Sequence, residues 1–143
     1  MNEIWVVITS NGQILTKSEK NALAAGRLCK QNGTVLTAIL PGGQPSAASD
    51  LSHFGVDRVI HLSNARNDAD AIAYLLHHLT LERTPSVILL TADNLGHETA
   101  ARLAAQLQAH LTQDCVALEM APPPCKGFTW VRHCMSDQCR EIC

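Results

Sequence analysis

The sequence VILLTADNLGHETAARLAAQL, residues 87–107, decides the fold class. It begins with Val87-Ile88-Leu89-Leu90-Thr91, an apolar run typical of a strand that is buried on both faces. A polar turn at 92–96 follows, and apolar residues then recur at helical spacing from 97 to 111. A buried strand joined by a short loop to an amphipathic helix is the repeating unit of a parallel α/β sheet.

The same unit recurs along the chain. Further apolar strands are predicted at 4–9, 35–40, 58–62 and 115–119. The intervening helices are predicted to begin at a Thr16 capping box, near Pro45 and at Asp68, and to stop near Gly33, Gly55 and Leu81. We therefore predict a three-layer α/β/α Rossmann-like sandwich with a mainly parallel five-stranded sheet and an irregular C-terminal tail.

Length and composition are consistent with one domain. The chain has 143 residues, which favours a domain at 1–121, followed at 122–143 by a proline-rich spacer and a cysteine-rich tail. One short strand is also compatible with residues 128–133. Hydrophobic residues make up 46% and aromatic residues only 3%, so the core should be aliphatic, and two cysteines, Cys29 and Cys115, should be core thiols.

Charge and hydropathy argue against two classes of partner. The net charge is −2 and the basic residues are scattered, so no nucleic-acid partner is expected. No apolar run is long enough to span a membrane, and the start of the chain has no basic leader. We therefore expect a soluble, cytoplasmic protein with reduced thiols.

Four segments give the chain a resemblance to a known family. They are the opening Ile4-Trp5-Val6-Val7-Ile8 strand with its Asn-Gly turn, the segment 54–60 (FGVDRVI), the segment 85–90 (PSVILL), and the segment 94–107 (NLGHETAARLAAQL). In order and spacing they resemble the N-terminal domain of electron transfer flavoprotein alpha subunits over about residues 3–133. Two positions depart from the family pattern, because His97 replaces an arginine and Ala101 replaces a proline.

This resemblance implies a function. Family members pass electrons from dehydrogenases to an acceptor through FAD held in an alpha–beta heterodimer, and a second domain makes most of the flavin contacts. The chain resembles the part without that domain, as a truncated product, a split subunit or an excised domain would. It would then be a scaffold or docking component that binds no cofactor alone, with FAD in the complex. Its partners would be a beta-type subunit or an FAD-domain protein, and a dehydrogenase.

The loops at the carboxyl ends of the first and fourth strands are the predicted ligand-binding edge. Thr91, Asn94, Gly96 and His97 are the candidate cofactor-binding residues, because backbone N–H groups at a helix start favour an anion. The simpler interpretation, which we favour, is that Asp93 or Asn94 caps the helix and Gly96 eases the turn. The main alternative function is a small protein, similar to universal stress proteins, that binds AMP or ATP at these loops.

Residues for catalysis or metal binding are less evident. Ser10, Ser63 and Thr91 lie at predicted strand ends, but no nucleophile-elbow motif accompanies them, so no catalytic residue and no enzymatic activity is predicted. The alternative is a metal-tethered module, because thiolates bind zinc or iron–sulfur clusters. Its candidate ligands are Cys134, Cys139 and Cys143. Their spacing lacks the C-x-x-C pairs typical of such sites, and exposed thiols on a tail are the simpler interpretation.

Overall fold

A computed structural model describes residues 2–10, 14–42, 48–63, 65–120, 128–134 and 137–142. The chain divides into two compact units, residues 1–111 and 112–143. The second unit thus begins inside the region that the sequence assigned to the first domain, and the domain boundary after residue 121 stays a prediction.

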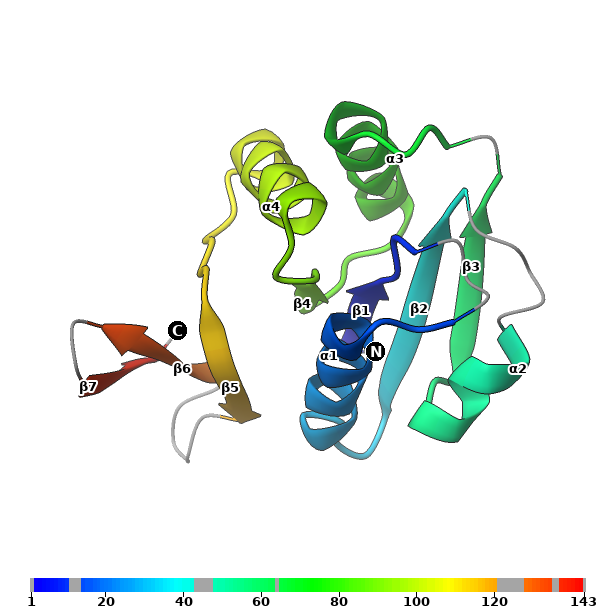
Figure 1. Cartoon of the computed structure of the whole chain (residues 1–143). Helices are drawn as coiled ribbons and strands as arrows, with labels where there is room; N and C mark the ends of the chain where they lie inside the picture. The colour runs from blue at the N-terminus through cyan, green and yellow to red at the C-terminus, as the bar shows by residue number, and fades with distance from the viewer. Residues whose placement is uncertain are drawn as a thin grey trace. The chain divides into compact units, whose positions relative to one another are not determined.

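The first unit is built on a four-stranded parallel sheet with the strand order β3-β2-β1-β4 (Figure 1). Its strands are β1 (Asn2–Val7), β2 (Thr34–Pro41), β3 (Arg58–Leu62) and β4 (Val87–Leu89). Pairing is parallel throughout this sheet. The predicted Rossmann-like α/β fold is therefore confirmed, although this sheet has four strands where five were predicted.

The two faces of the sheet are covered by different helices, because alternate residues of a strand point to opposite sides. Trp5 and Val7 of β1 belong to the core beneath α3 (Ala69–Glu82) and α4 (Asn94–Leu107). On the other face, α1 (Lys17–Leu28) packs closely, since a Cβ on Gly26 would lie 2.8 Å from Cδ1 of Leu36 and 3.3 Å from Cγ2 of Val6. Figure 1 shows α1 and α2 on one face and α3 and α4 on the other.

Most of the helix ends follow from caps that the sequence predicted. The Thr16 capping box is present at α1, and Asp68 caps α3 by accepting the N–H of Ala71. After α2 (Ala48–Leu51) and the 3-10 turn η2 (Ser52–Phe54), Gly55 stops the helix with φ of 77°. The start that was predicted near Pro45 lies outside the described residues.

The ends of two helices differ from those that the sequence pattern predicted. Helix α1 ends at Leu28, and Gly33, with φ of +82°, lies in the turn before β2. Helix α4 begins at Asn94 because Asp93 caps it, and it ends at Leu107 because Gln108 takes a left-handed conformation with φ of 51°. The prediction that α4 runs from 97 to 111 was wrong at both ends.

The second unit is a three-stranded antiparallel sheet with the order β5-β6-β7. Its strands are β5 (Cys115–Met120), β6 (Phe128–Cys134) and β7 (Asp137–Ile142). The strand expected near 128–133 is confirmed. Two other predictions were wrong, because residues 115–120 pair antiparallel with β6 and the tail after 128 contains regular strands. The links from β5 to β6 and from β6 to β7 are too short for a parallel crossover, so neighbouring strands pair as hairpins.

Candidate functional site

The strand order places the switch point of the sheet between β1 and β4. From β1 the chain crosses to β2 on one side, whereas β4 lies on the other side, with Ile4 beside Val87 and Val6 beside Leu89. The loops that leave the carboxyl ends of β1 and β4 therefore emerge next to each other. This is the edge where open α/β sheets bind ligands, and it is the edge that the sequence predicted.

The loop after β1 is tied to helix α1 by one buried carboxylate. Glu19, only 1% exposed, accepts the backbone N–H of Ser10 at 2.8 Å and the Ser10 hydroxyl at 2.8 Å. Its Oε2 also accepts the N–H of Thr16 at 2.9 Å, while the Thr16 hydroxyl oxygen accepts the N–H of Glu19 at 3.2 Å. The start of α1 is thus occupied by a negative charge of the chain itself.

The loop after β4 is closed in the same way. Asp93 Oδ1 accepts the N–H of Gly96 at 2.8 Å, and its Oδ2 accepts the hydroxyl of Thr91 at 2.7 Å. Thr91 is only 3% exposed whereas Asp93 is exposed, so this hydrogen bond is partly buried. The Asp93 carboxylate caps α4 at the place where an anionic ligand would bind the helix start. The negative charges of the ligand and of Asp93 would repel each other there.

Gly96 is required by its contact with the backbone of Thr91, in the loop that follows β4. A Cβ placed on it would lie 1.9 Å from the carbonyl oxygen of Thr91 and 2.9 Å from its carbonyl carbon. The sequence suggested that Gly96 would let a ligand approach closely, and here the group that approaches is the Thr91 carbonyl. These contacts account for the glycine without any ligand.

The four candidate cofactor residues gather within one loop and one helical turn. Asn94 is exposed at the first position of α4, His97 is half-buried one turn on, and Thr91 and Gly96 are buried. The backbone N–H of His97 donates to the carbonyl oxygen of Asp93 at 2.9 Å. The structure thus brings these residues together, and their assignment to a cofactor stays a prediction.

Two further groups of potential metal ligands are a pair of histidines on α3 and the three cysteines of the tail. On α3, the rings of His77 and His78 are 5.7 Å apart, and Tyr74 contacts His78 edge-on at 4.3 Å. No group of three metal-ligating side chains occurs among the residues that the structure describes. The side chains of Cys134, Cys139 and Cys143 lie outside those residues, so the metal alternative stays untested.

The two cysteines of regular segments differ. Cys29 is buried at the end of α1, as predicted, whereas Cys115 is exposed at the start of β5. The prediction of a core thiol at Cys115 was wrong because its strand does not enter the parallel sheet.

A charged network at the opposite edge of the sheet was not predicted. Glu3 accepts the hydroxyl of Thr37 at 2.6 Å and faces guanidinium nitrogens of Arg58 at 3.1 Å and Arg83 at 3.6 Å. Burial alone would raise the pKa of the Glu3 carboxyl, but the Thr37 hydrogen bond and the two arginines outweigh it and hold the pKa below its usual value. The one signal in the sequence is an acidic residue at the head of an apolar strand.

Among described residues, no helix is both long and apolar enough to cross a bilayer.

The comparisons with known proteins all indicate the same family. The family model described as "Electron transfer flavoprotein domain" matches residues 4–138.

Three curated proteins illustrate the similarity. The acryloyl-CoA reductase electron transfer subunit beta of Anaerotignum propionicum is 32% identical over an alignment of 123 residues that covers 82% of this chain and 34% of that protein. The electron transfer flavoprotein subunit alpha of Clostridium acetobutylicum is 30% identical over 122 residues, 82% of this chain and 36% of that protein. Protein FixB of Clostridium saccharobutylicum is 29% identical over 121 residues, again 82% of this chain and 36% of that protein. The chain thus spans about a third of the length of the curated relatives it matches.

Proposed function

The chain belongs to the electron transfer flavoprotein domain family, and from this premise we propose that it is the scaffold and docking part of an FAD-dependent electron carrier. The match to electron transfer flavoprotein alpha subunits supports an N-terminal, alpha-type role. In this proposal the chain carries out no reaction of its own, and it positions the partner that holds the flavin.

The unmatched part of the relatives supports placing the flavin outside the segment that this chain matches. The relatives have about two thirds of their length outside the segment that matches this chain. We propose that FAD is held by a protein segment equivalent to that remainder, together with a beta-type subunit. A dehydrogenase or reductase would exchange electrons with the assembled carrier, and one relative is named as the electron transfer subunit of a reductase. The cytoplasmic location expected from the sequence stays part of the proposal.

The proposal rests on the state of the two helix starts at the switch point of the sheet. The helix starts at both loops are occupied by carboxylates of the chain, Glu19 at α1 and Asp93 at α4. A nucleotide phosphate would have to displace these groups or lie beside them, and both outcomes are unfavourable. AMP or ATP binding by the chain alone is therefore not favoured.

Within the assembled carrier, the residues at this edge keep a candidate role. Asn94 is exposed and could contact a cofactor presented by the partner, with His97 one turn behind it. Thr91 and Gly96 would then act indirectly, by fixing the start of α4. This division of roles fits a domain that borders the flavin site and does not form it.

A domain exchange tests the proposal. In the alpha subunit of Clostridium acetobutylicum, the segment of 122 residues that this chain matches is replaced by the full chain. The resulting hybrid alpha subunit is produced together with the beta subunit of that flavoprotein. We expect a heterodimer that elutes with flavin absorbance. The control is the same alpha subunit without its N-terminal segment, which should fail to assemble. If the exchanged protein assembles no better than this control, the proposed scaffold role is wrong.

A further inference from the structure

The outer face of α1 carries an uneven distribution of charge. Lys17, Lys20 and Arg27 are all exposed, and their spacing places them on one side of the helix over about 15 Å. The acidic residue within the helix, Glu19, is buried in the capping box. Among the described residues, no carboxylate lies within ion-pair distance of these three cations. In a chain of net charge −2, this helix face is a local excess of positive charge.

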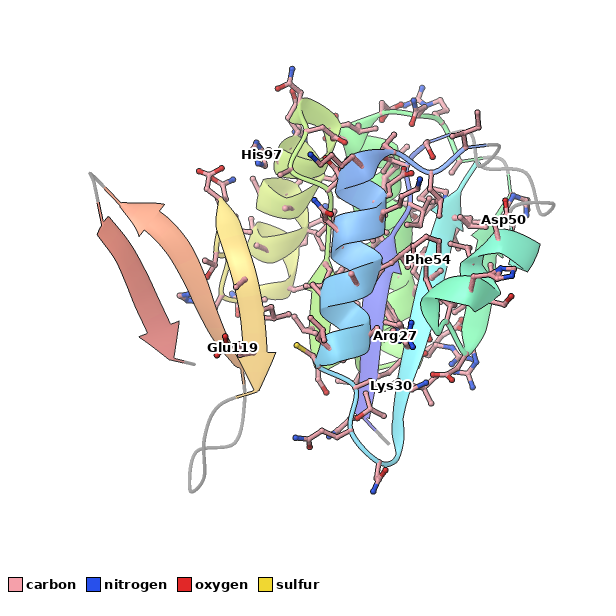
Figure 2. All side chains as sticks on the ribbon, turned by 60° about the horizontal axis from the view of Figure 1, so that its bottom comes forward. Arg27, Lys30, Asp50, Phe54, His97 and Glu119 are labelled. Atoms are coloured by element: carbon pink, nitrogen blue, oxygen red, sulfur yellow. The ribbon has the colours of Figure 1, made fainter. Side chains whose placement is uncertain are left out.

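The end of this face is a shallow hollow lined by Arg27, Lys30, Gln31 and Asn32. Figure 2 shows Arg27 and Lys30 at the same end of α1. Its lining consists of two cations and two amides. Such a surface is suited to receive carboxylates, since every lining side chain can donate hydrogen bonds.

The two cations of the hollow have different surroundings. Lys30 Nζ lies 2.6 Å from Oδ1 of Asp57, whose Oδ2 accepts the backbone N–H of Leu36 at 2.8 Å. The stem of Arg27 packs over the left-handed turn at Gly55, because a Cβ there would lie 3.3 Å from Arg27 Cδ. Because Asp57 already pairs with Lys30, the uncompensated charge at this end of the helix face is that of Arg27.

An apolar anchor accompanies the charges. Leu28 follows Arg27 directly and is 81% exposed, among the most exposed of the large hydrophobic residues that the structure describes. Together with the cations on the same side of the helix, Leu28 resembles the apolar centre and polar rim of a protein interface. A small anion would need neither Leu28 nor the length of the stripe.

From these observations we propose that the outer face of α1, from Lys17 to Asn32, docks an acidic surface of another protein. Naming that protein as the flavin-bearing partner of the carrier rests on the proposed function. Opposite charges would steer the two surfaces together and set their register, and Leu28 would supply the desolvated contact. Such docking is expected to weaken as ionic strength rises.

A titration of the full chain labelled with ¹⁵N tests this directly. Oligoglutamate peptide containing leucine is added, and inorganic phosphate and phosphatidylglycerol vesicles are added to separate samples. We expect saturable shifts of amide resonances within 17–32 on adding the peptide, reversed by salt. The same saturable shifts with phosphate alone would mean a small-anion site, and shifts with vesicles but not peptide would mean a membrane surface. Either result, or no shift at all, overturns the proposal.

Matched variants sharpen the test. The double variant Lys20→Gln/Arg27→Gln and the single variant Arg66→Glu each lower the net charge by two, but Arg66 lies before α3, away from this face. The double variant should bind the peptide about tenfold more weakly, since two exposed ion pairs near the upper end of their usual strength are lost. Arg66→Glu should bind as the wild type does. Equal weakening by both variants would show a general charge effect and overturn the proposal.

The exchanged heterodimer separates this proposal from the function. If the wild-type chain fails to assemble, the proposed function fails, whereas the peptide titration still tests α1 docking. If the wild-type chain assembles and the double variant assembles with equal affinity and equal salt dependence, the carrier role stands and the α1 surface is not its docking site.

Discussion

Replacing Gly96 with alanine separates a structural role of this residue from a ligand-binding role. Gly96 lies in the first turn of α4, where alanine is intrinsically the better helix former by about 1 kcal/mol. If the glycine served only to admit a ligand, the variant without ligand would therefore be more stable than the wild type. The structure predicts the opposite sign, because the new Cβ would lie 1.9 Å from the carbonyl oxygen of Thr91.

The magnitude follows from three contributions. Forcing an extra carbon against fixed backbone costs about 1–3 kcal/mol. Moving the start of α4 away also weakens the 2.8 Å hydrogen bond from Gly96 to Asp93. A lost cap of this kind costs about 1 kcal/mol. Setting the gain in helix propensity against these losses leaves a net destabilisation of about 2 kcal/mol.

Urea unfolding of the protein without any nucleotide measures this effect, with circular dichroism and tryptophan fluorescence, to which the fully buried Trp5 contributes, as probes. Ala105→Gly, on the exposed side of the same helix, is the control and should cost about 1 kcal/mol through helix propensity alone. A Gly96→Ala variant as stable as the wild type, or more stable, would refute the packing argument and reopen the ligand interpretation.

Substitutions at three further positions test the charged groups of the first unit. Glu3→Gln should lower the free energy of unfolding by about 2 kcal/mol near neutral pH, because Arg58 and Arg83 lose their partner. The folded pKa of Glu3 is lowered, so its contribution is present above the unfolded pKa and lost as pH falls through the folded value. Urea midpoints from neutral to acid pH should therefore fall more steeply for the wild type, and equal slopes would contradict this. Glu19→Ala should cost about 2–3 kcal/mol in thermal or urea unfolding, since buried donors lose their acceptor, and a loss below that of a surface substitution would count against the buried cap. Asp93→Ala should cost about 1–2 kcal/mol and Asp93→Asn much less, whereas equal losses would show that the side chain does not act as the cap.

Local sequence signals predicted much of the first unit. The Thr16 capping box, the Asp68 cap and the left-handed Gly55 each depend on residues within a few positions, and each is found in the structure. The location of the switch point also followed, because the order of strands and helices restricts where the sheet can reverse. These features depend on local chemistry and on connection rules, which a sequence displays directly.

Features that depend on distant residues were missed. The strand at 115–120 is apolar enough for a parallel sheet, but the short connection to residues 128–134 pairs it as a hairpin instead. The end of α4 was missed because Gln108 adopts φ of 51°, a conformation that sequence patterns assign mainly to glycine. The network around Glu3 joins residues from separate strands and from the end of α3, so only the folded sheet assembles it.

The domain boundary and the cofactor-binding residues remain predictions. Residue 121 was chosen where the proline run begins, whereas the compact units divide between 111 and 112. The candidate residues of the α4 loop were correctly placed near one another, since a strand end and the following helix start are always adjacent. What the sequence could not display is that the Asp93 side chain accepts the Gly96 N–H and that the Thr91 carbonyl takes up the space beside Gly96.

Calorimetric titration of the isolated full chain with FAD, and separately with ATP and AMP, tests the central claim most directly. Because Glu19 and Asp93 occupy the two helix starts at the switch point, we predict no saturable heat for any of the three nucleotides. Saturable binding of a nucleotide to the chain alone, lost in an Asn94→Ala variant that keeps the wild-type stability, would contradict the scaffold role and assign the nucleotide site to this chain.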